Sequence, residues 1–244
     1  MKKLILILLA VAAAHGPAQA QKNSYVNEWI EVSARFLVAN WMADDGVKKY
    51  APPQVLPIAT GSKVYGACGE NITGDEVGGS AYCPATHTVY LVPEELGEFE
   101  AAFGSSSVAY VVAHEFGHAF QSALEIPLSG PAQELQADCF AGMLIGSGSE
   151  TIGINRDDVR AMAIAAYNIG SDTHGTGEQR AFALLTGMGV FDGNCNAETM
   201  QSLANGQMDQ DPRMKSLNEE RSSGLKINTN ETPYPKNSKT LFGL

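Results

Sequence analysis

The stretch that decides the fold runs from Ser106 to Gln121, SSVAYVVAHEFGHAFQ, and carries an H-E-x-x-H pattern. At about 100° per residue of a helix, His114 and His118 lie about 40° apart on one face, so both imidazoles can hold the same metal ion. Glu115 lies about 100° round from His114, where its carboxylate can reach a water on that ion without acting as a ligand. This spacing predicts a Zn²⁺ site with a general base on a single helix.

The alternative is a chance match on a solvated helix, and the composition of the stretch argues against it. Large apolar side chains surround the motif and predict a buried helix: Tyr110, Val111, Val112, Phe116 and Phe120. Buried histidine and glutamate side chains are costly unless they have partners. A bound metal ion would supply that partner.

A third ligand is expected on the next helix, which the sequence predicts to begin at Pro131 and to run to about Ile145. Glu134 and Asp138 are four residues apart there and therefore share one face. In a helical hairpin, Glu134 would complete a His₂Glu ligand set with a fourth position left for water. Asp138 would accept the free N–H of a ligand imidazole and fix its tautomer. The apolar residues around both argue against the alternative, a solvated acidic pair.

The sequence THGTGEQR, from Thr173 to Arg180, supplies further candidates; it covers the end of a loop predicted at 171–177 and the start of the helix that follows. A hydrolase that forms a tetrahedral intermediate needs a hydrogen-bond donor for its oxyanion, and His174 or Arg180 could supply it. The alternative is an ordinary loop histidine, with Arg180 in a structural ion pair with Glu178 or another acid. Tyr82 and Tyr110 are the next candidate donors.

Together these segments resemble the bacterial family described as "putative neutral zinc metallopeptidase". The resemblance rests on the following segments: Cys68-Gly69, Tyr82-Cys83-Pro84, Val89-Tyr90-Leu91, Ala109 to Gln121, Glu134 to Gly142 and His174 to Arg180. It covers roughly residues 65–195 and is far more specific than H-E-x-x-H alone. It implies a zincin-like metallopeptidase domain with Glu134 as the third ligand, and a functional role for the His174 loop.

The fold class predicted from the pattern along the chain is α+β and helix-dominated, with a small sheet beside the helix that carries H-E-x-x-H. Apolar periodicity and capping residues predict helices over 25–46, 93–103, 106–121, 131–145 and 178–188, and one that follows Asn155-Arg156-Asp157-Asp158 and ends at Gly170. Residues 86–92 are predicted to form a strand, and residues 51–61 a Pro-rich connection. His87 is expected on that strand, partly exposed and without a catalytic role.

The two ends of the chain are expected to lie outside the domain. Residues 1–20 read as a signal peptide, with a basic start, a short apolar run and small residues before Gln21, where the mature chain would begin. The apolar run is too short to cross a bilayer, so no stable membrane anchor is expected. Residues 21–206 would form one metallopeptidase domain, and residues 207–244 a polar tail, extended or disordered. The protein would be exported, either to the periplasm or outside the cell.

Cysteine usage fits an oxidising compartment. The chain has four cysteines, Cys68, Cys83, Cys139 and Cys195, which predict two disulfides. Four cysteines allow three pairings. We favour Cys68–Cys83, because these residues flank a short Gly-rich stretch, and therefore Cys139–Cys195.

The charge balance limits the partners. The chain has 16 Lys and Arg against 27 Asp and Glu, a formal net charge of −11. This acidity argues against a nucleic-acid partner, which requires a basic face, and against docking on anionic membranes. The expected partner is a peptide or protein substrate, and the oligomeric state is left open.

The resulting hypothesis is a zinc-dependent peptidase in which Glu115 takes a proton from the zinc-activated water. Two alternatives stay open. The chain could be a zinc-stabilised binding module without turnover, although such a module would not need Glu115. It could also hydrolyse another amide, such as a peptidoglycan cross-link.

Overall fold

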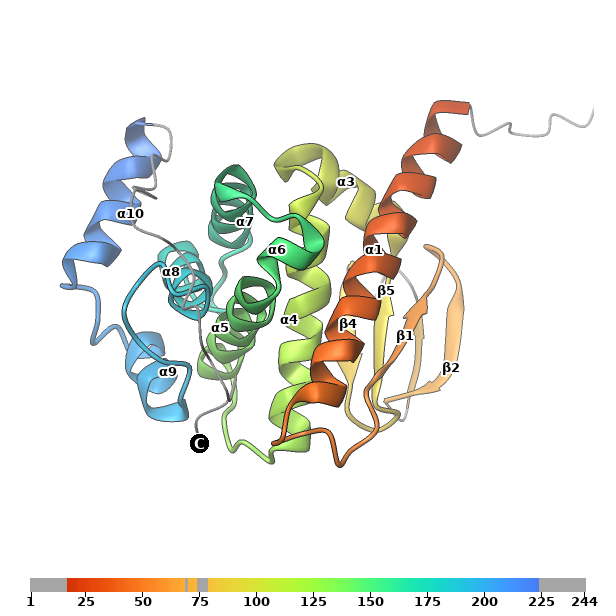
Figure 1. Cartoon of the computed structure of the whole chain (residues 1–244), viewed down its shortest axis with the longest axis horizontal. Coiled ribbons are helices and arrows are strands. Elements are labelled where there is room, and N and C mark those ends of the chain that lie inside the picture. The colour runs from red at the N-terminus through yellow and green to blue at the C-terminus, as the bar shows by residue number, and fades with distance from the viewer. Residues whose placement is uncertain (1–16, 69, 74–78, 224–244) are drawn as a thin grey trace, which may run out of the picture.

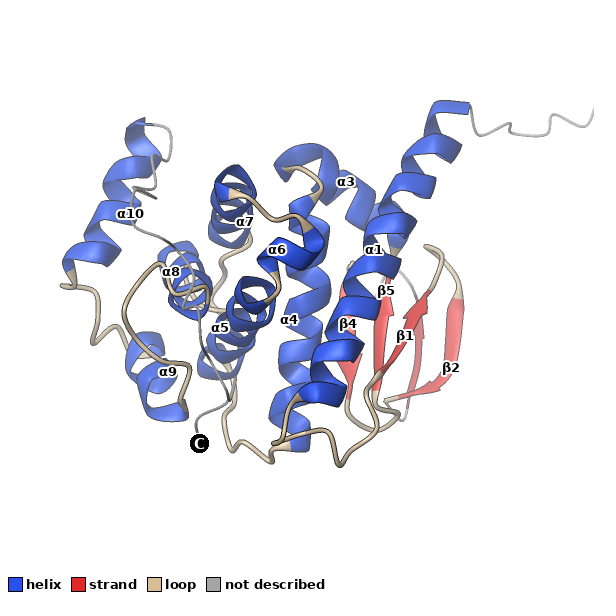
Figure 2. Ribbon diagram, viewed as in Figure 1, coloured by secondary structure: helices blue, strands red, loops and turns tan. Residues whose placement is uncertain are grey.

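Helices form most of the fold, and the strands gather on one side of it (Figures 1 and 2). The computed structural model describes residues 17–68, 70–73 and 79–223. The elements in chain order are α1 (Pro17–Ala43), β1 (Gln54–Pro57), β2 (Lys63–Ala67), β3 (Glu70–Thr73), β4 (Ser80–Cys83), β5 (Thr88–Leu91), α3 (Pro93–Phe103), α4 (Ser106–Ala123), α5 (Pro131–Ser147), α6 (Ser149–Ile152), α7 (Arg156–Asn168), α8 (Gly177–Gly187), α9 (Ala197–Ala204) and α10 (Pro212–Ser223). The predicted helix-dominated α+β class is therefore confirmed.

Helix α4 lies in the middle of the fold (Figure 1) and packs against α1, α3, α5 and α7 and against the sheet. Tyr110, Phe116 and Phe120 are fully buried, as the apolar sequence around the H-E-x-x-H motif predicts. Burial on several sides explains why this helix is apolar nearly all round. The motif is thus carried by the most enclosed helix rather than by a solvated one.

The sheet beside α4 has the strand order β1-β5-β4, with β1 parallel to β5 and β4 antiparallel to it. Strands β1 and β4 are the two edges of this sheet, and β4 packs against α4. A separate antiparallel pair joins β2 and β3. The predicted strand at 86–92 corresponds to β5. However, the predicted connection at 51–61 contains β1, whose short length and prolines conceal its pairing with β5.

The prediction that His87 lies on the strand is wrong. His87 occupies the turn before β5, with a positive φ of 49°. Its Nε2 lies 2.8 Å from the Ala51 carbonyl, and its Nδ1 lies 2.7 Å from the Tyr82 hydroxyl. The side chain thus joins this turn to the connection that precedes β1, which is a structural role.

The C-terminal part of the described chain also corrects a prediction. Residues 212–223 form helix α10, although residues 207–244 were expected to be extended or disordered. Met214 and Leu217 are buried against the core, and the Arg213 guanidinium lies over the Phe182 ring. Two apolar residues three positions apart suffice to dock an otherwise polar helix. Residues 224–244 lie outside the described residues.

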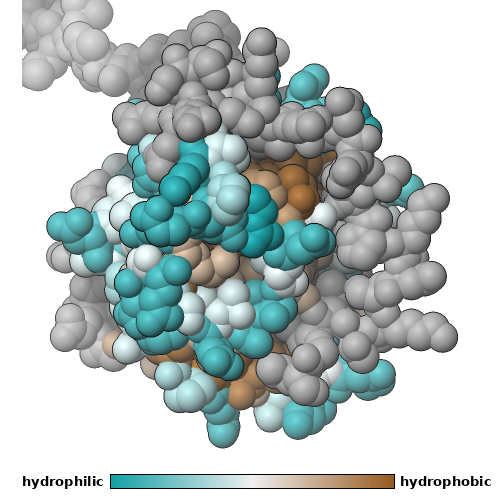
Figure 3. All heavy atoms as spheres, turned by 90° about the vertical axis from the view of Figure 1, so that its left-hand side faces the viewer, coloured by the Kyte–Doolittle hydropathy of each residue, from teal (hydrophilic) through white to brown (hydrophobic). Residues whose placement is uncertain are grey.

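The surface that carries α9 and α10 is mostly hydrophilic where its residues are described, with smaller apolar areas between (Figure 3). None of the helices in the described part of the chain combines the length and the apolar character needed to cross a bilayer. The predicted signal peptide falls mainly on residues 1–16, outside the described residues, whereas residues 17–20 begin α1.

Both predicted disulfides are present, Cys68–Cys83 and Cys139–Cys195. The first joins the end of β2 to the end of β4. The second joins α5 to the segment before α9. Each bond restricts the unfolded chain, and the longer loop of the second restricts it more. Two structural disulfides fit an oxidising compartment.

Close contact between α4 and α5 depends on Gly117. A Cβ atom added there would lie 2.7 Å from the Ala137 carbonyl oxygen and 2.9 Å from the Ala137 Cα. Real Cβ atoms do not approach the backbone of another helix so closely. Glycine at this position therefore lets α5, which carries Glu134, approach the histidines of α4.

Replacement of Gly117 by alanine is expected to destabilise the protein. At an exposed helix position this change stabilises by about 1 kcal/mol, because alanine is the better helix former. Here overpacking against α5 should instead lower the free energy of unfolding by about 1–3 kcal/mol. Urea denaturation of metal-free wild type and Gly117→Ala measures the sign. Equal or greater stability of the variant would show that the two helices are not in close contact.

Candidate metal centre

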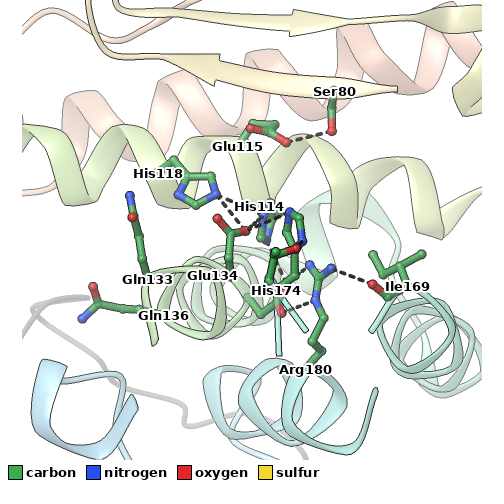
Figure 4. Close-up of polar contacts among 12 residues, drawn as sticks. Ser80, His114, Glu115, His118, Gln133, Glu134, Gln136, Ile169, His174 and Arg180 are labelled. Atoms are coloured by element: carbon green, nitrogen blue, oxygen red, sulfur yellow. Dashed lines mark hydrogen bonds and ion pairs between the residues drawn. The ribbon is translucent and has the colours of Figure 1, made fainter. Parts of the chain in front are cut away.

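Three side chains from two helices converge on one point (Figure 4). His114 and His118 come from α4, and Glu134 comes from the first turn of α5. The two Nε2 atoms lie 3.2 Å apart, and Glu134 Oε2 lies 3.3 Å from His114 Nε2 and 3.4 Å from His118 Nε2. The helical hairpin expected from the sequence therefore brings the predicted ligand set together.

The spacing of these three atoms fits zinc. Tetrahedral Zn²⁺ with bonds of about 2.0–2.1 Å places neighbouring ligand atoms about 3.3–3.4 Å apart. All three separations are close to that value. The donor set, two imidazoles and a carboxylate, is also one that zinc uses when a further position is left open. Among the described residues, this is the group of His, Cys, Asp and Glu side chains that could hold a metal ion.

Asp138 orients His114 through a buried network. Its Oδ1 lies 2.8 Å from His114 Nδ1 and accepts a hydrogen bond of 2.6 Å from the Tyr110 hydroxyl. Arg180 Nε donates to Asp138 Oδ2 at 2.8 Å, and Arg180 Nη2 donates to Oδ1 at 2.9 Å. Asp138 accepts a hydrogen bond from the Nδ1–H group of His114. This leaves the lone pair of the imidazole on Nε2, which faces the centre.

The charges of this network shift several pKa values. Burial alone would raise the pKa of Asp138, but the charges of Arg180 and His114 hold it well below its usual range. Burial would also raise the pKa of Glu134, and the two histidines hold it well below its usual range. Burial lowers the pKa of His114, but Asp138 and Glu134 outweigh this effect and raise it to about 10. The metal-free site therefore favours a positive charge between its donor atoms.

Arg180 is committed to this network rather than free to meet a substrate. Its side chain is 5% exposed, and besides Asp138 it donates to the Tyr110 hydroxyl at 3.2 Å and to the Ile169 carbonyl at 3.3 Å. Asp138 raises the pKa of Arg180 above its usual value despite burial, which lowers it. Of the two sequence hypotheses for Arg180, the structure favours the ion pair with another acid, and that acid is Asp138.

His118 is oriented by a second chain of polar groups that the sequence analysis missed. Its Nδ1 lies 2.9 Å from Gln121 Oε1, and Gln121 Nε2 donates to the Gln133 carbonyl and to Gln136 Oε1. Gln136 Nε2 donates at 2.8 Å to the carbonyl of Cys195, a disulfide residue. Gln121 and Gln136, two glutamines in helices that the sequence predicts to be buried, were the available signal, because buried amides require partners.

Glu115 points from α4 towards the edge strand β4 (Figure 4). The Ser80 hydroxyl donates to Glu115 Oε1 at 2.7 Å, and the Glu115 residue is only 5% exposed. Ser80 was not among the sequence candidates, since a serine 35 residues away carries no local signal. Glu115 is thus beside the centre without being one of its three ligands.

His174 lies over the centre at the tip of its loop. Its Nε2 is 3.9 Å from Glu134 Oε2, and half of its side chain is exposed. Its Nδ1 lies 3.0 Å from the Ser171 hydroxyl and 2.8 Å from the Thr173 hydroxyl. Gly175 has φ +91°, and an added Cβ would lie 2.9 Å from Leu135. Glycine therefore lets the loop approach α5 closely.

Two cavities meet at this centre. The larger, about 740 Å³, extends towards α3, and the smaller, about 450 Å³, extends along β4 and the ends of α4 and α5. Ser80, His114, Glu115 and His174 line both cavities. Volumes of this size are typical of ligand sites. The candidate centre is thus accessible from two sides.

The H-E-x-x-H helix, the acidic third donor on the following helix and the small adjoining sheet define a zincin-like fold. The model of the family described as "Putative neutral zinc metallopeptidase" matches residues 10–129. The family resemblance inferred from the sequence is therefore confirmed. The matched residues include His114, Glu115 and His118 but end before Glu134, so the third donor, Asp138 and the His174 loop rest on geometry.

Curated relatives share about one third of the aligned residues. "Uncharacterized protein YpfJ" from Escherichia coli K12 is 31% identical over 141 residues, which cover 44% of this chain and 49% of that protein. "Uncharacterized protein Rv2575" from Mycobacterium tuberculosis H37Rv is 30% identical over 156 residues, 48% of this chain and 53% of that protein. The chain thus spans about half the length of the curated relatives it matches. No solved structure shows significant similarity to it.

Removal of Glu134 is expected to release the metal. Wild type stripped with a chelator should rebind one zinc ion per chain. Glu134→Ala should bind it more than about 100-fold more weakly, since loss of a mere supporting partner typically costs 10–100-fold. Competition with a chromogenic chelator measures the affinity. Glu198→Ala, in the exposed first turn of α9, is the matched control. Wild-type affinity in Glu134→Ala would place the third ligand elsewhere.

Proposed function

We propose that this protein is a zinc-dependent peptidase that hydrolyses peptide bonds of polypeptide substrates outside the cytoplasm. The observation that carries the proposal is the convergence of His114, His118 and Glu134 within 3.2–3.4 Å of one another, with Glu115 beside them. The family match supports the same conclusion through its description. The two disulfides support action in an oxidising compartment, whether periplasmic or extracellular.

The residues of the site divide the work between holding the ion and moving a proton. His114, His118 and Glu134 would hold zinc. The ion, when bound, supplies a Lewis acid that polarises a carbonyl and lowers the pKa of water. Glu115 acts as the general base, accepts a proton from the attacking water and returns it to the leaving amine. Glu115 Oε1 accepts a hydrogen bond from the Ser80 hydroxyl, so Oε2 is the oxygen available for this proton transfer.

His174 is proposed as the donor to the oxyanion. Ser171 and Thr173 each place a hydroxyl against its Nδ1, and if these donate, the ring proton lies on Nε2. That nitrogen is the one nearest the centre. Of the other candidates, Tyr110 is buried and donates to Asp138. The Tyr82 hydroxyl contacts His87 Nδ1, but Tyr82 lines the smaller cavity and is the second choice.

Strand β4 supports an extended polypeptide as substrate. It is one of the two edge strands of its sheet and contributes Ser80, Ala81 and Tyr82 to the smaller cavity, beside the centre. An exposed strand edge can pair with an extended peptide through main-chain hydrogen bonds. The same site could also accept a peptidoglycan cross-link, and the experiment below separates the two substrates.

Glu115→Gln is expected to abolish turnover but not metal binding. The amide keeps the shape of the side chain but cannot accept the proton, so kcat/KM should fall by about 10²–10⁴. Casein and a peptide library are the substrates, and zinc content is measured in parallel. Glu150→Gln, on the exposed surface of α6, should match wild type.

Two results would replace the proposal with its alternatives. Equal rates for zinc-loaded wild type and Glu115→Gln on every substrate would favour a binding module without turnover. Release of peptidoglycan fragments by wild type, without cleavage of any peptide in the library, would favour the cross-link substrate.

His174→Ala should leave zinc content and unfolding temperature unchanged, because His174 is half-exposed and outside the ligand set. Loss of one oxyanion donor typically costs about 10²–10³ in kcat, and KM should change much less. Steady-state kinetics on a cleaved library peptide measures both. Loss of zinc would instead make His174 a ligand, and unchanged kcat would direct attention to Tyr82.

A further inference from the structure

The two cavities that meet at the candidate centre have different walls. Apart from the residues of the centre, the smaller cavity is mainly polar, with Gln121, Ser122, Glu125 and Gln133 among its residues. The larger cavity is bounded by apolar side chains of α3 and α4. An extended substrate that crosses the centre therefore meets a polar environment on one side and an apolar one on the other.

The apolar wall is a defined surface. Leu96, Phe99 and Phe103 contribute it from α3, and Val111 contributes it from α4. Phe99 and Phe103 are one helical turn apart, and their rings contact edge-on with centroids 4.8 Å apart. Leu96 is buried beneath them, while both phenylalanines are only partly buried. Partly exposed aromatic side chains around a cavity of about 740 Å³ are suited to a large apolar group.

The charges around the same cavity are mainly negative. Glu98 lines it from α3, and Glu115 lines it from α4. Arg180 also lines it, but its charge is compensated by Asp138 at 2.8 Å. The chain as a whole carries a formal net charge of −11. An acidic side chain would therefore be repelled from this cavity, whereas an apolar one would not.

We infer that the protein is an endopeptidase selective for bonds beside a large apolar residue, whose side chain occupies the cavity between α3 and α4. Acidic residues at that position are disfavoured. This inference rests on the proposed function and names its substrate class. Internal cleavage follows because there is space for substrate on both sides of the centre, and selectivity follows because only one side is apolar.

Helix α3 offers a matched pair of variants. Ala101 and Ala102 are both exposed on α3, but only Ala102 lines the cavity. Ala102→Trp should fill the apolar cavity without disturbing the core. Ala101→Trp adds the same side chain to the same helix outside the cavity and serves as the control.

The probes are decapeptides with both ends blocked that differ at one central position, which is Phe, Leu, Ala or Asp. Binding to zinc-loaded Glu115→Gln is measured by fluorescence anisotropy, and cleavage by wild type is mapped by mass spectrometry. The Phe and Leu peptides should bind at least about tenfold more tightly than the Ala peptide, and the Asp peptide more weakly than the Ala peptide. Wild type should cut the Phe and Leu peptides at a bond of the variable residue.

The two α3 variants test whether this cavity causes the preference for Phe over Ala. In the Glu115→Gln background, Ala102→Trp should remove the preference for Phe over Ala, and Ala101→Trp should keep it. Equal binding of all four peptides, an unchanged preference in Ala102→Trp, or failure of wild type to cut the blocked decapeptides when it cuts the same sequences with free ends would overturn the inference. Selective binding with no turnover by wild type would contradict the proposed function but retain the cavity assignment, so the two failures are distinguishable.

Discussion

The buried carboxylate of Asp138 is the interaction on which the rest of the site depends. It joins three helices, because it lies on α5, contacts Tyr110 and His114 on α4, and pairs with Arg180 on α8. Asp138 is 0% exposed, and a charge this deeply buried is tolerated only when it is paired and hydrogen-bonded. Loss of any one of these partners would leave the buried Asp138 charge incompletely compensated. The network therefore fixes how the helices pack and, through His114 Nδ1, how the first ligand points.

The second ligand is oriented by neutral groups instead. Gln121 Oε1 contacts His118 Nδ1, and Gln121 Nε2 donates to Gln136 Oε1. Gln136 in turn donates to the carbonyl of Cys195. The Cys139–Cys195 disulfide holds that carbonyl beside α5. One imidazole is thus supported by an ion pair and the other by amides. The two supports share α5, which also supplies Glu134, so the geometry of all three donors follows from the position of that helix against α4.

The centre lies where the helices meet the edge of the sheet. On the helical side are the ligands and their supports, all largely buried. On the sheet side are Ser80 and Glu115, whose hydrogen bond places the proposed base at the boundary of both cavities. His174, on a loop that returns over the centre, completes the enclosure from a third direction.

The sequence by itself determined the features that are local. The spacing of His114, Glu115 and His118 fixes their positions on a helix, and the apolar residues between them require that helix to be buried. The four-residue spacing of Glu134 and Asp138 likewise placed both on one face. The boundaries of α3, α4, α5 and α8, the fold class and the pairing of the cysteines also followed from periodicity, capping residues and spacing.

Only the tertiary structure decided the contacts between distant segments. Arg180 pairs with Asp138 over 42 residues, and Ser80 meets Glu115 over 35, so no local pattern reports either contact. Strand β1 is hidden among prolines, and α10 is held by only two buried side chains. Periodicity states which face of an element is buried but not which partner covers it. That choice is made by the packing of the whole chain, and it turned Arg180 from a candidate for substrate contact into a support for the metal centre.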